Sequence, residues 1–128
     1  MPTFPVVTGD VLTSTIFNGL PAFAVQTAKT VDYTAASGDE YQQLIPMNKA
    51  TAIAFKIPTD ATYAFPVGTV ITVLNIGVGT CTISAVTPGT TTVLSAGSTA
   101  ASPTVAQYKS AACIKTAANA WYIVGAVA

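Results

Sequence analysis

From residue 29 onward, short apolar runs alternate with clusters of turn-forming residues. The runs are rich in β-branched and aromatic side chains, and Gly, Pro, Asn and Asp separate them, a pattern typical of β-strands joined by turns. It predicts eight strands, over residues 30–34, 41–47, 51–57, 69–75, 80–86, 90–95, 107–116 and 121–127. Strands of this length and spacing predict an all-β fold, a small β-sandwich or roll of about eight strands.

The Gly77-Val78-Gly79 connection is the strongest local signal in this region. A link this short between two strands predicts a hairpin over residues 69–86. The small polar residues of 95–103 show no periodicity and predict a surface loop.

The strand over residues 69–75 carries apolar side chains on both of its faces. Alternation places Val70, Thr72 and Leu74 on one face and Ile71, Val73 and Asn75 on the other. We therefore expect both faces to be covered, by a second sheet or by a neighbouring subunit.

Residues 1–28 read as an N-terminal arm, distinct from a β module over residues 29–128. Asp10 as the N-cap, apolar residues at helical spacing and Gly19 as the stop predict a helix of about two turns. So short a helix is unstable in water without a surface to pack on, which favours an anchoring role. The candidate docking residues of the arm are Phe4, Leu12, Ile16, Phe17, Leu20 and Phe23. In the alternative interpretation, the segment covers one end of the core of its own domain.

Charge is scarce along the chain: charged residues make up 8% of the sequence, and the formal net charge is zero. A surface with so few charges is poorly protected against association, so we expect part of it to be buried against other protein. Neutrality also argues against nucleic-acid binding, which needs clustered cations. The apolar runs are too short to cross a membrane, and the Pro-containing start lacks the features of a secretory signal peptide.

The chain contains neither His nor Arg, because all five basic residues are Lys. This inventory excludes Ser/His/Asp and Cys/His nucleophiles, His-ligated metals and arginine fingers. We therefore expect a non-enzymatic protein without a cofactor.

Five carboxylates are the remaining candidates for chemistry. Asp39 and Glu40 are adjacent, but neighbours at the start of a strand tend to point apart, whereas glycosidase-type catalysis needs two carboxyl groups facing one cleft. Asp10, Asp32 and Asp60 are explained as cap, strand-edge and turn residues. The spacing does not match a calcium loop either, so we expect no metal site.

Two cysteines and several aromatic residues lie within predicted strands. Cys81 and Cys113 are expected to be small buried core residues, with a cross-strand or an intersubunit disulfide as the alternative. The aromatic residues are expected to form the core or a subunit contact. The alternative is that Tyr63, Tyr108 or Trp121 stacks on a sugar ring.

The strand-rich part resembles a small β module of structural proteins from tailed bacteriophages. The runs that carry the resemblance are AFPVGTVITVLNIGVGTCTISAV, TTTVLSAG and AQYKSAACIKTAANAWYIVGAV. In that family a Phe-Pro-x-Gly-Thr opening leads into a Gly-x-Gly hairpin, and the module closes on a Tyr, a Lys-Thr turn and a Trp-containing last strand. The matching positions are Phe65, Pro66, Gly68, Thr69, Gly77, Gly79, Tyr108, Lys115, Thr116 and Trp121. The opening TGDVLTSTIFNGLPAF is similar to a segment near the start of phage tail-fibre and minor virion proteins.

The resemblance implies a non-enzymatic virion component, usually trimeric, with no catalytic residues to carry over. A short arm beside one module favours a trimeric capsid decoration (cement) protein on the outer capsid surface, made in the host cytoplasm. Its expected partners are other copies of itself and the major capsid protein or another virion protein. The alternative is a tail-fibre or minor tail component with a receptor- or glycan-binding β tip. An enzyme such as a depolymerase would find little machinery in this sequence.

Overall fold

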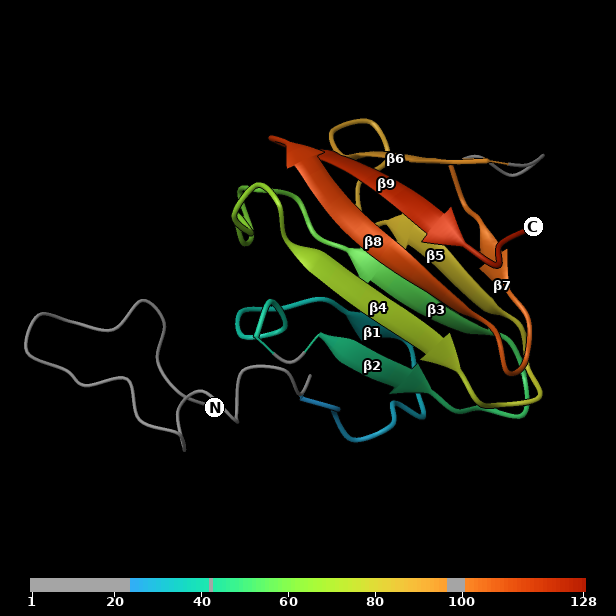
Figure 1. The fold of residues 1–128 in the computed structure, drawn as a ribbon. Helices are drawn as coiled ribbons and strands as arrows, with labels where there is room; N and C mark the ends of the chain where they lie inside the picture. Colours follow the sequence, from blue (N-terminus) through green and yellow to red (C-terminus); the bar gives the residue numbers. More distant parts are fainter. Residues whose placement is uncertain (1–23, 42, 97–100) are drawn as a thin grey trace, which may run out of the picture.

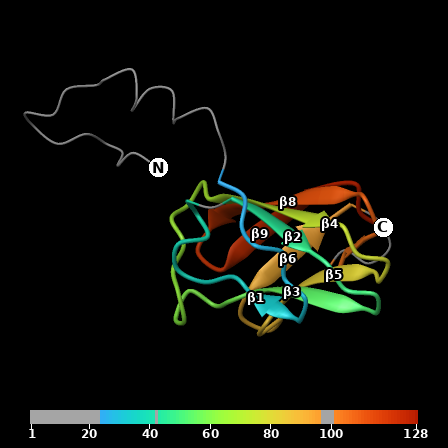
Figure 2. The ribbon, with the colours of Figure 1, turned by 90° about the horizontal axis from the view of Figure 1, so that it is seen from below.

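The computed structural model describes residues 24–41, 43–96 and 101–128, which form nine strands in two sheets (Figure 1). The strands are β1 (Tyr33–Thr34), β2 (Leu44–Met47), β3 (Ile53–Ile57), β4 (Val70–Asn75), β5 (Cys81–Ala85), β6 (Thr92–Ser95), β7 (Thr104–Val105), β8 (Ser110–Ala117) and β9 (Ala120–Gly125). One sheet has the order β1-β3-β5-β7 and the other β2-β4-β8-β9-β6. Viewed from below, β8 and β4 lie in one layer and β3 and β5 in the other (Figure 2).

The all-β expectation is confirmed, and each predicted strand overlaps an observed one. The one observed strand that was not predicted is β7, which begins directly after the predicted loop over 95–103. Asn75 Nδ2 holds β7 in place by donating a 2.8 Å hydrogen bond to the Val105 carbonyl oxygen. The described residues include no helix, and thus none long and apolar enough to cross a membrane. The predicted helix near Asp10 lies outside the described residues.

The chain changes sheet at every connection from β1 to β8, so strands that are neighbours in a sheet are not neighbours in sequence. β3 pairs in parallel with β5, and β2 with β4. In both pairs each residue lies beside the one 28 positions further along, as Leu44 beside Thr72 and Ile53 beside Cys81. The unit β2–β3 is thus stacked on the unit β4–β5. Among the described strands, only β8 and β9 follow one another within a sheet.

The predicted hairpin over residues 69–86 is wrong, because β4 and β5 belong to different sheets. Gly77 and Gly79 lie in an arch that crosses between the sheets and packs on the arch between β2 and β3. The amide of Gly79 donates a 2.9 Å hydrogen bond to the Lys49 carbonyl oxygen. A Cβ atom on Gly79 would overlap the backbone of Thr51. These glycines therefore allow the backbones of the two arches to approach closely, and they do not form a tight hairpin turn.

The core lies between the sheets and is built from the alternate, inward-facing residues of the strands. Its largest fully buried side chain is Trp121, whose ring packs edge to face on Phe65 at a centroid distance of 5.6 Å. The inner face of β4 is covered in this way, as Ile71, Val73 and Asn75 are all buried. The module's strand pairing also extends to the N-terminal side of residue 29, because Val25 forms a parallel bridge to Leu44.

Candidate interaction surface

The outward side of the five-stranded sheet carries uncharged, mostly aliphatic side chains. Burial alternates along β4, β8 and β9, so every second residue points away from the core. We call this surface the apolar face. Its residues are Leu44, Val70, Thr72, Leu74, Leu94, Ala112, Ile114, Tyr122 and Val124. The hydroxyl residues Thr92, Ser110 and Thr116 lie on the same side of the sheet, toward the strand ends. None of them carries a charge.

Strand register arranges eight of these residues in two rows across the sheet. The first row crosses four adjacent strands and consists of Val70, Ile114, Tyr122 and Leu94. The second row runs beside it and consists of Leu44, Thr72, Ala112 and Val124. Tyr122, Val124 and Leu94 are 47%, 49% and 42% exposed. The rows thus form one continuous surface, not scattered apolar residues.

The outward side of the four-stranded sheet is polar by comparison. The residues on it that carry hydroxyl or ammonium groups are Thr34, Lys56, Thr82, Ser84 and Thr104. A sheet face in contact with water is normally polar in this way, whereas a contiguous apolar face marks a site of interaction. The two sides of the sandwich therefore differ in what they can bind.

A mostly apolar hollow adjoins the apolar face at the edge of the five-stranded sheet. It is lined by Gln43, Leu44, Val70 and Thr72. The backbone of Ala24 reaches the same edge, where its carbonyl oxygen accepts a hydrogen bond from the Leu44 amide. The arm residues Phe4, Leu12, Ile16, Phe17, Leu20 and Phe23 lie outside the described residues.

Asp39 and Glu40, the adjacent carboxylates, are buried in the loop between β1 and β2. Asp39 accepts hydrogen bonds from the Tyr33 hydroxyl (2.7 Å), the Ala36 amide (2.8 Å) and the Gln26 side chain (2.6 Å). Glu40 accepts from the Gly38 amide (2.6 Å) and from the Tyr63 hydroxyl. Burial, together with the hydrogen bond to Asp39, raises the pKa of Tyr33, so its hydroxyl keeps the proton that it donates.

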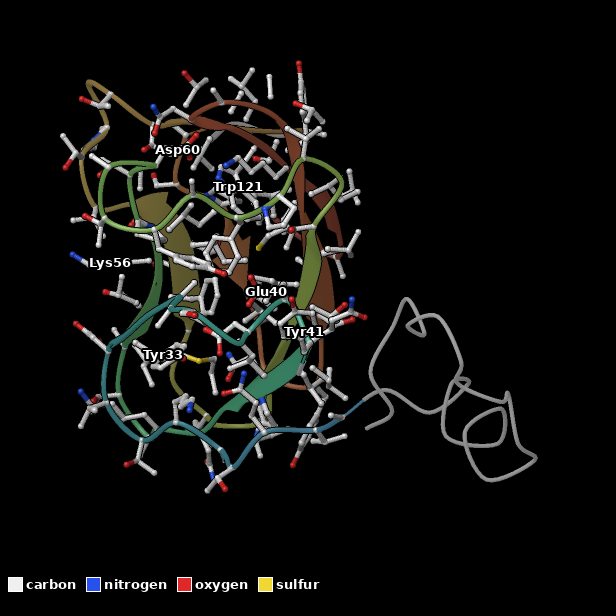
Figure 3. All side chains as sticks on the ribbon, turned by 90° about the vertical axis from the view of Figure 1, so that its left-hand side faces the viewer. Tyr33, Glu40, Tyr41, Lys56, Asp60 and Trp121 are labelled. Atoms are coloured by element: carbon white, nitrogen blue, oxygen red, sulfur yellow. The ribbon has the colours of Figure 1, made fainter. Side chains whose placement is uncertain are left out.

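The other described carboxylates also bind groups of their own fold. Asp60, in the connection between β3 and β4, pairs with Lys115. Asp32 accepts a 2.9 Å hydrogen bond from the Ala54 amide. Figure 3 shows Glu40 and Asp60 on separate loops at one end of the sandwich. In the part of the chain that the structure describes, no three His, Cys, Asp or Glu side chains are grouped so that they could hold a metal.

The aromatic residues proposed for sugar stacking do not share one surface. Trp121 is 1% exposed and offers no ring face to a ligand. Tyr63 packs edge to face on Phe65 at 4.6 Å, and its hydroxyl is bonded to Glu40. Tyr108 is 76% exposed, in a left-handed backbone conformation after β7. Any stacking by these residues would therefore fall mainly to Tyr108.

Cys81 and Cys113 are both free and buried, so the predicted cross-strand disulfide is wrong. Lys115, matched to a Lys-Thr turn by the resemblance, lies within β8 and points inward, and the chain turns only after Ala117. Of the apolar face, sequence reasoning found the β4 residues but missed Ile114 and Tyr122. The sequence pattern could have revealed both residues, because each lies next to an inward-facing residue in a predicted strand and must therefore point outward.

Comparison with protein-family models, with curated proteins and with solved structures finds no match to this chain.

Proposed function

We propose that this chain is a non-enzymatic structural component of a bacteriophage virion, a homotrimeric decoration protein on the outer surface of the capsid. The observation that carries the proposal is the apolar face, a large uncharged surface on one side of a two-sheet module. Such a surface suits permanent contact with other protein, because its burial releases water from apolar side chains.

Two further observations support a structural role. The described carboxylates are engaged in hydrogen bonds that hold loops together. The phage resemblance covers both the module and the arm, and it provides the virion as the setting in which such a protein works. In this proposal the arm attaches to the particle and the module assembles with other copies.

The test is attachment of the full chain to particles of the phage that encodes it. We expect the purified protein to bind the particle, and electron cryomicroscopy to show the two-sheet module on the capsid exterior. Leu12→Asp with Ile16→Asp, in the arm, should abolish binding. The matched control is Val31→Asp with Val78→Asp, which alters two exposed loop residues of the module and should leave binding unchanged.

Absence of the protein from the particle would refute the proposal. Density on a tail fibre instead of the capsid would favour the receptor-binding alternative. The exposed Tyr108 would then be the first residue to replace in a glycan-binding assay.

A further inference from the structure

We propose that the apolar face is the contact between copies of this chain, each face being covered by the same face of a neighbouring copy. A contact between identical faces joins chains in pairs, so it links chains of two neighbouring trimers and is additional to the three-fold contact within a trimer. The inference rests on the proposed function for that trimer. The surface itself is identified by strand register, burial and side-chain chemistry.

The size of the face is adequate for such a contact. Five strands at about 4.8 Å spacing and about six residues at roughly 3.4 Å give about 500 Å² for the whole outward side of the five-stranded sheet, of which the apolar face is the central part. Two copies facing each other would bury about 1,000 Å², the lower end for a specific interface, and protruding side chains add to this.

The large and small side chains of the apolar face are arranged so that two copies of the face can fit together. On the central strand β8, Ala112 lies between the larger residues around it: Ile114 is two positions along, and Val124 is its partner on β9. The row that contains Ile114 and Tyr122 thus forms a ridge beside a depression at Ala112. A second copy presents the same ridge and depression, so two faces can interdigitate as sheets do in a sandwich.

The absence of charge is compatible with a second copy as the partner. The nine residues of the face carry no charge, so two copies can approach without desolvating an ion. A single extended segment, such as the arm of the same chain, would cover a strip about one strand, or roughly 5 Å, wide. The two rows lie about 7 Å apart, so a single strand laid along one row leaves the other uncovered, whereas a sheet covers both.

The experiment is sedimentation equilibrium of the full chain at micromolar concentration, without particles. We expect a mass equal to an even number of 13.0 kDa chains, because the contact joins chains in pairs. Tyr122→Glu and Leu94→Glu should each place an unpaired carboxylate in the contact and weaken association by about 100-fold. Tyr122→Phe should preserve it. The matched control is Thr82→Glu on the polar side of the sandwich, which should leave the mass unchanged.

Circular dichroism and thermal melting identify any variant that fails to fold. A wild-type protein that stays monomeric at high micromolar concentration overturns the inference, whatever the variants do. An oligomer that Thr82→Glu disrupts as strongly as Tyr122→Glu also overturns it. An oligomer that does not attach to particles leaves this interface in place and refutes the virion role. A monomer that attaches through the apolar face refutes self-association and points to a capsid protein as the occupant.

Discussion

The ammonium group of Lys115 lies 2.8 Å from Asp60 Oδ1, although the Lys115 side chain is only 2% exposed. The same Nζ donates a 2.6 Å hydrogen bond to the carbonyl oxygen of Phe65. Lys115 belongs to β8, whereas both acceptors belong to the connection between β3 and β4. One buried cation therefore links the five-stranded sheet to a loop that leaves the other sheet.

Replacing this cation should destabilise the fold strongly. In Lys115→Met, Asp60 loses its counter-ion and the Phe65 carbonyl loses its donor, so we expect the free energy of unfolding to fall by about 3 kcal/mol. Urea unfolding followed by Trp121 fluorescence measures the change. Lys56→Met is the control, because Lys56 lies on the outward side of β3, and its effect should stay within about 0.5 kcal/mol. Equal losses in both variants would contradict the role given to the ion pair.

The stacked arches predict that Gly79 does not tolerate a side chain. In Gly79→Ala the new methyl group would overlap the Thr51 backbone, so one arch must move and stability should fall by about 2–3 kcal/mol. Gly89→Ala is a matched control, since a Cβ at Gly89 meets no atom within 4 Å. The control should be neutral or stabilising by up to about 1 kcal/mol. Thermal denaturation compares the two, and a tolerated alanine at Gly79 would disprove the close stacking.

The buried carboxylate of Asp39 should contribute more to stability than the carboxylate of Asp32. Asp39→Ala leaves the Tyr33 hydroxyl and the Ala36 amide without their acceptor, with an expected loss of about 2–3 kcal/mol. Asp32→Ala removes one exposed hydrogen bond and should cost about 0.5 kcal/mol. Chemical denaturation of both variants provides the comparison. If Asp32→Ala is the more damaging change, the loop is held by other contacts.

The two thiols should be unreactive in the folded protein. Burial raises the pKa of Cys81 to about 11 and also raises the pKa of Cys113, so neither forms a reactive thiolate at neutral pH. We expect an aromatic disulfide reagent to modify neither thiol in the native state and both after unfolding in urea. Rapid native modification of Cys81 would show that the sheets open locally.

The same burial makes stability depend on alkaline pH. Above the ordinary thiol pKa near 9, the unfolded chain releases a proton from Cys81 that the folded chain retains. The free energy of unfolding should therefore decrease as the pH rises from about 9 to about 11. Below about pH 9 the buried Cys81 thiol should cause no such loss of stability, because it is protonated in both the folded and the unfolded chain. Urea titrations at about pH 8 and about pH 10 test the sign. Cys81→Ala should show a smaller decrease.

Local patterns predicted the strands well because alternation and turn residues act over a few positions. The pairing of the strands was not predictable in the same way. Gly77 and Gly79 separate two strands whether the chain makes a hairpin or an arch, and the difference depends on Lys49 and Thr51, 28 residues earlier. The apolar face shows the same limit. The apolar side chain of Tyr122 is visible in the sequence, but its place beside Ile114 and Leu94 depends on strand order.

The 28-residue offset between stacked units also bears on how the chain reaches its fold. Parallel strands such as β2 and β4 can pair only after a long loop has closed, and closing loops slows folding. Among the described strands, β8 and β9 are sequential partners in one sheet, joined through a short turn at Asn119. We therefore expect the hairpin of β8 and β9 to form first and the stacked arches to dock onto it, so that β9 must be synthesised before the sandwich can assemble.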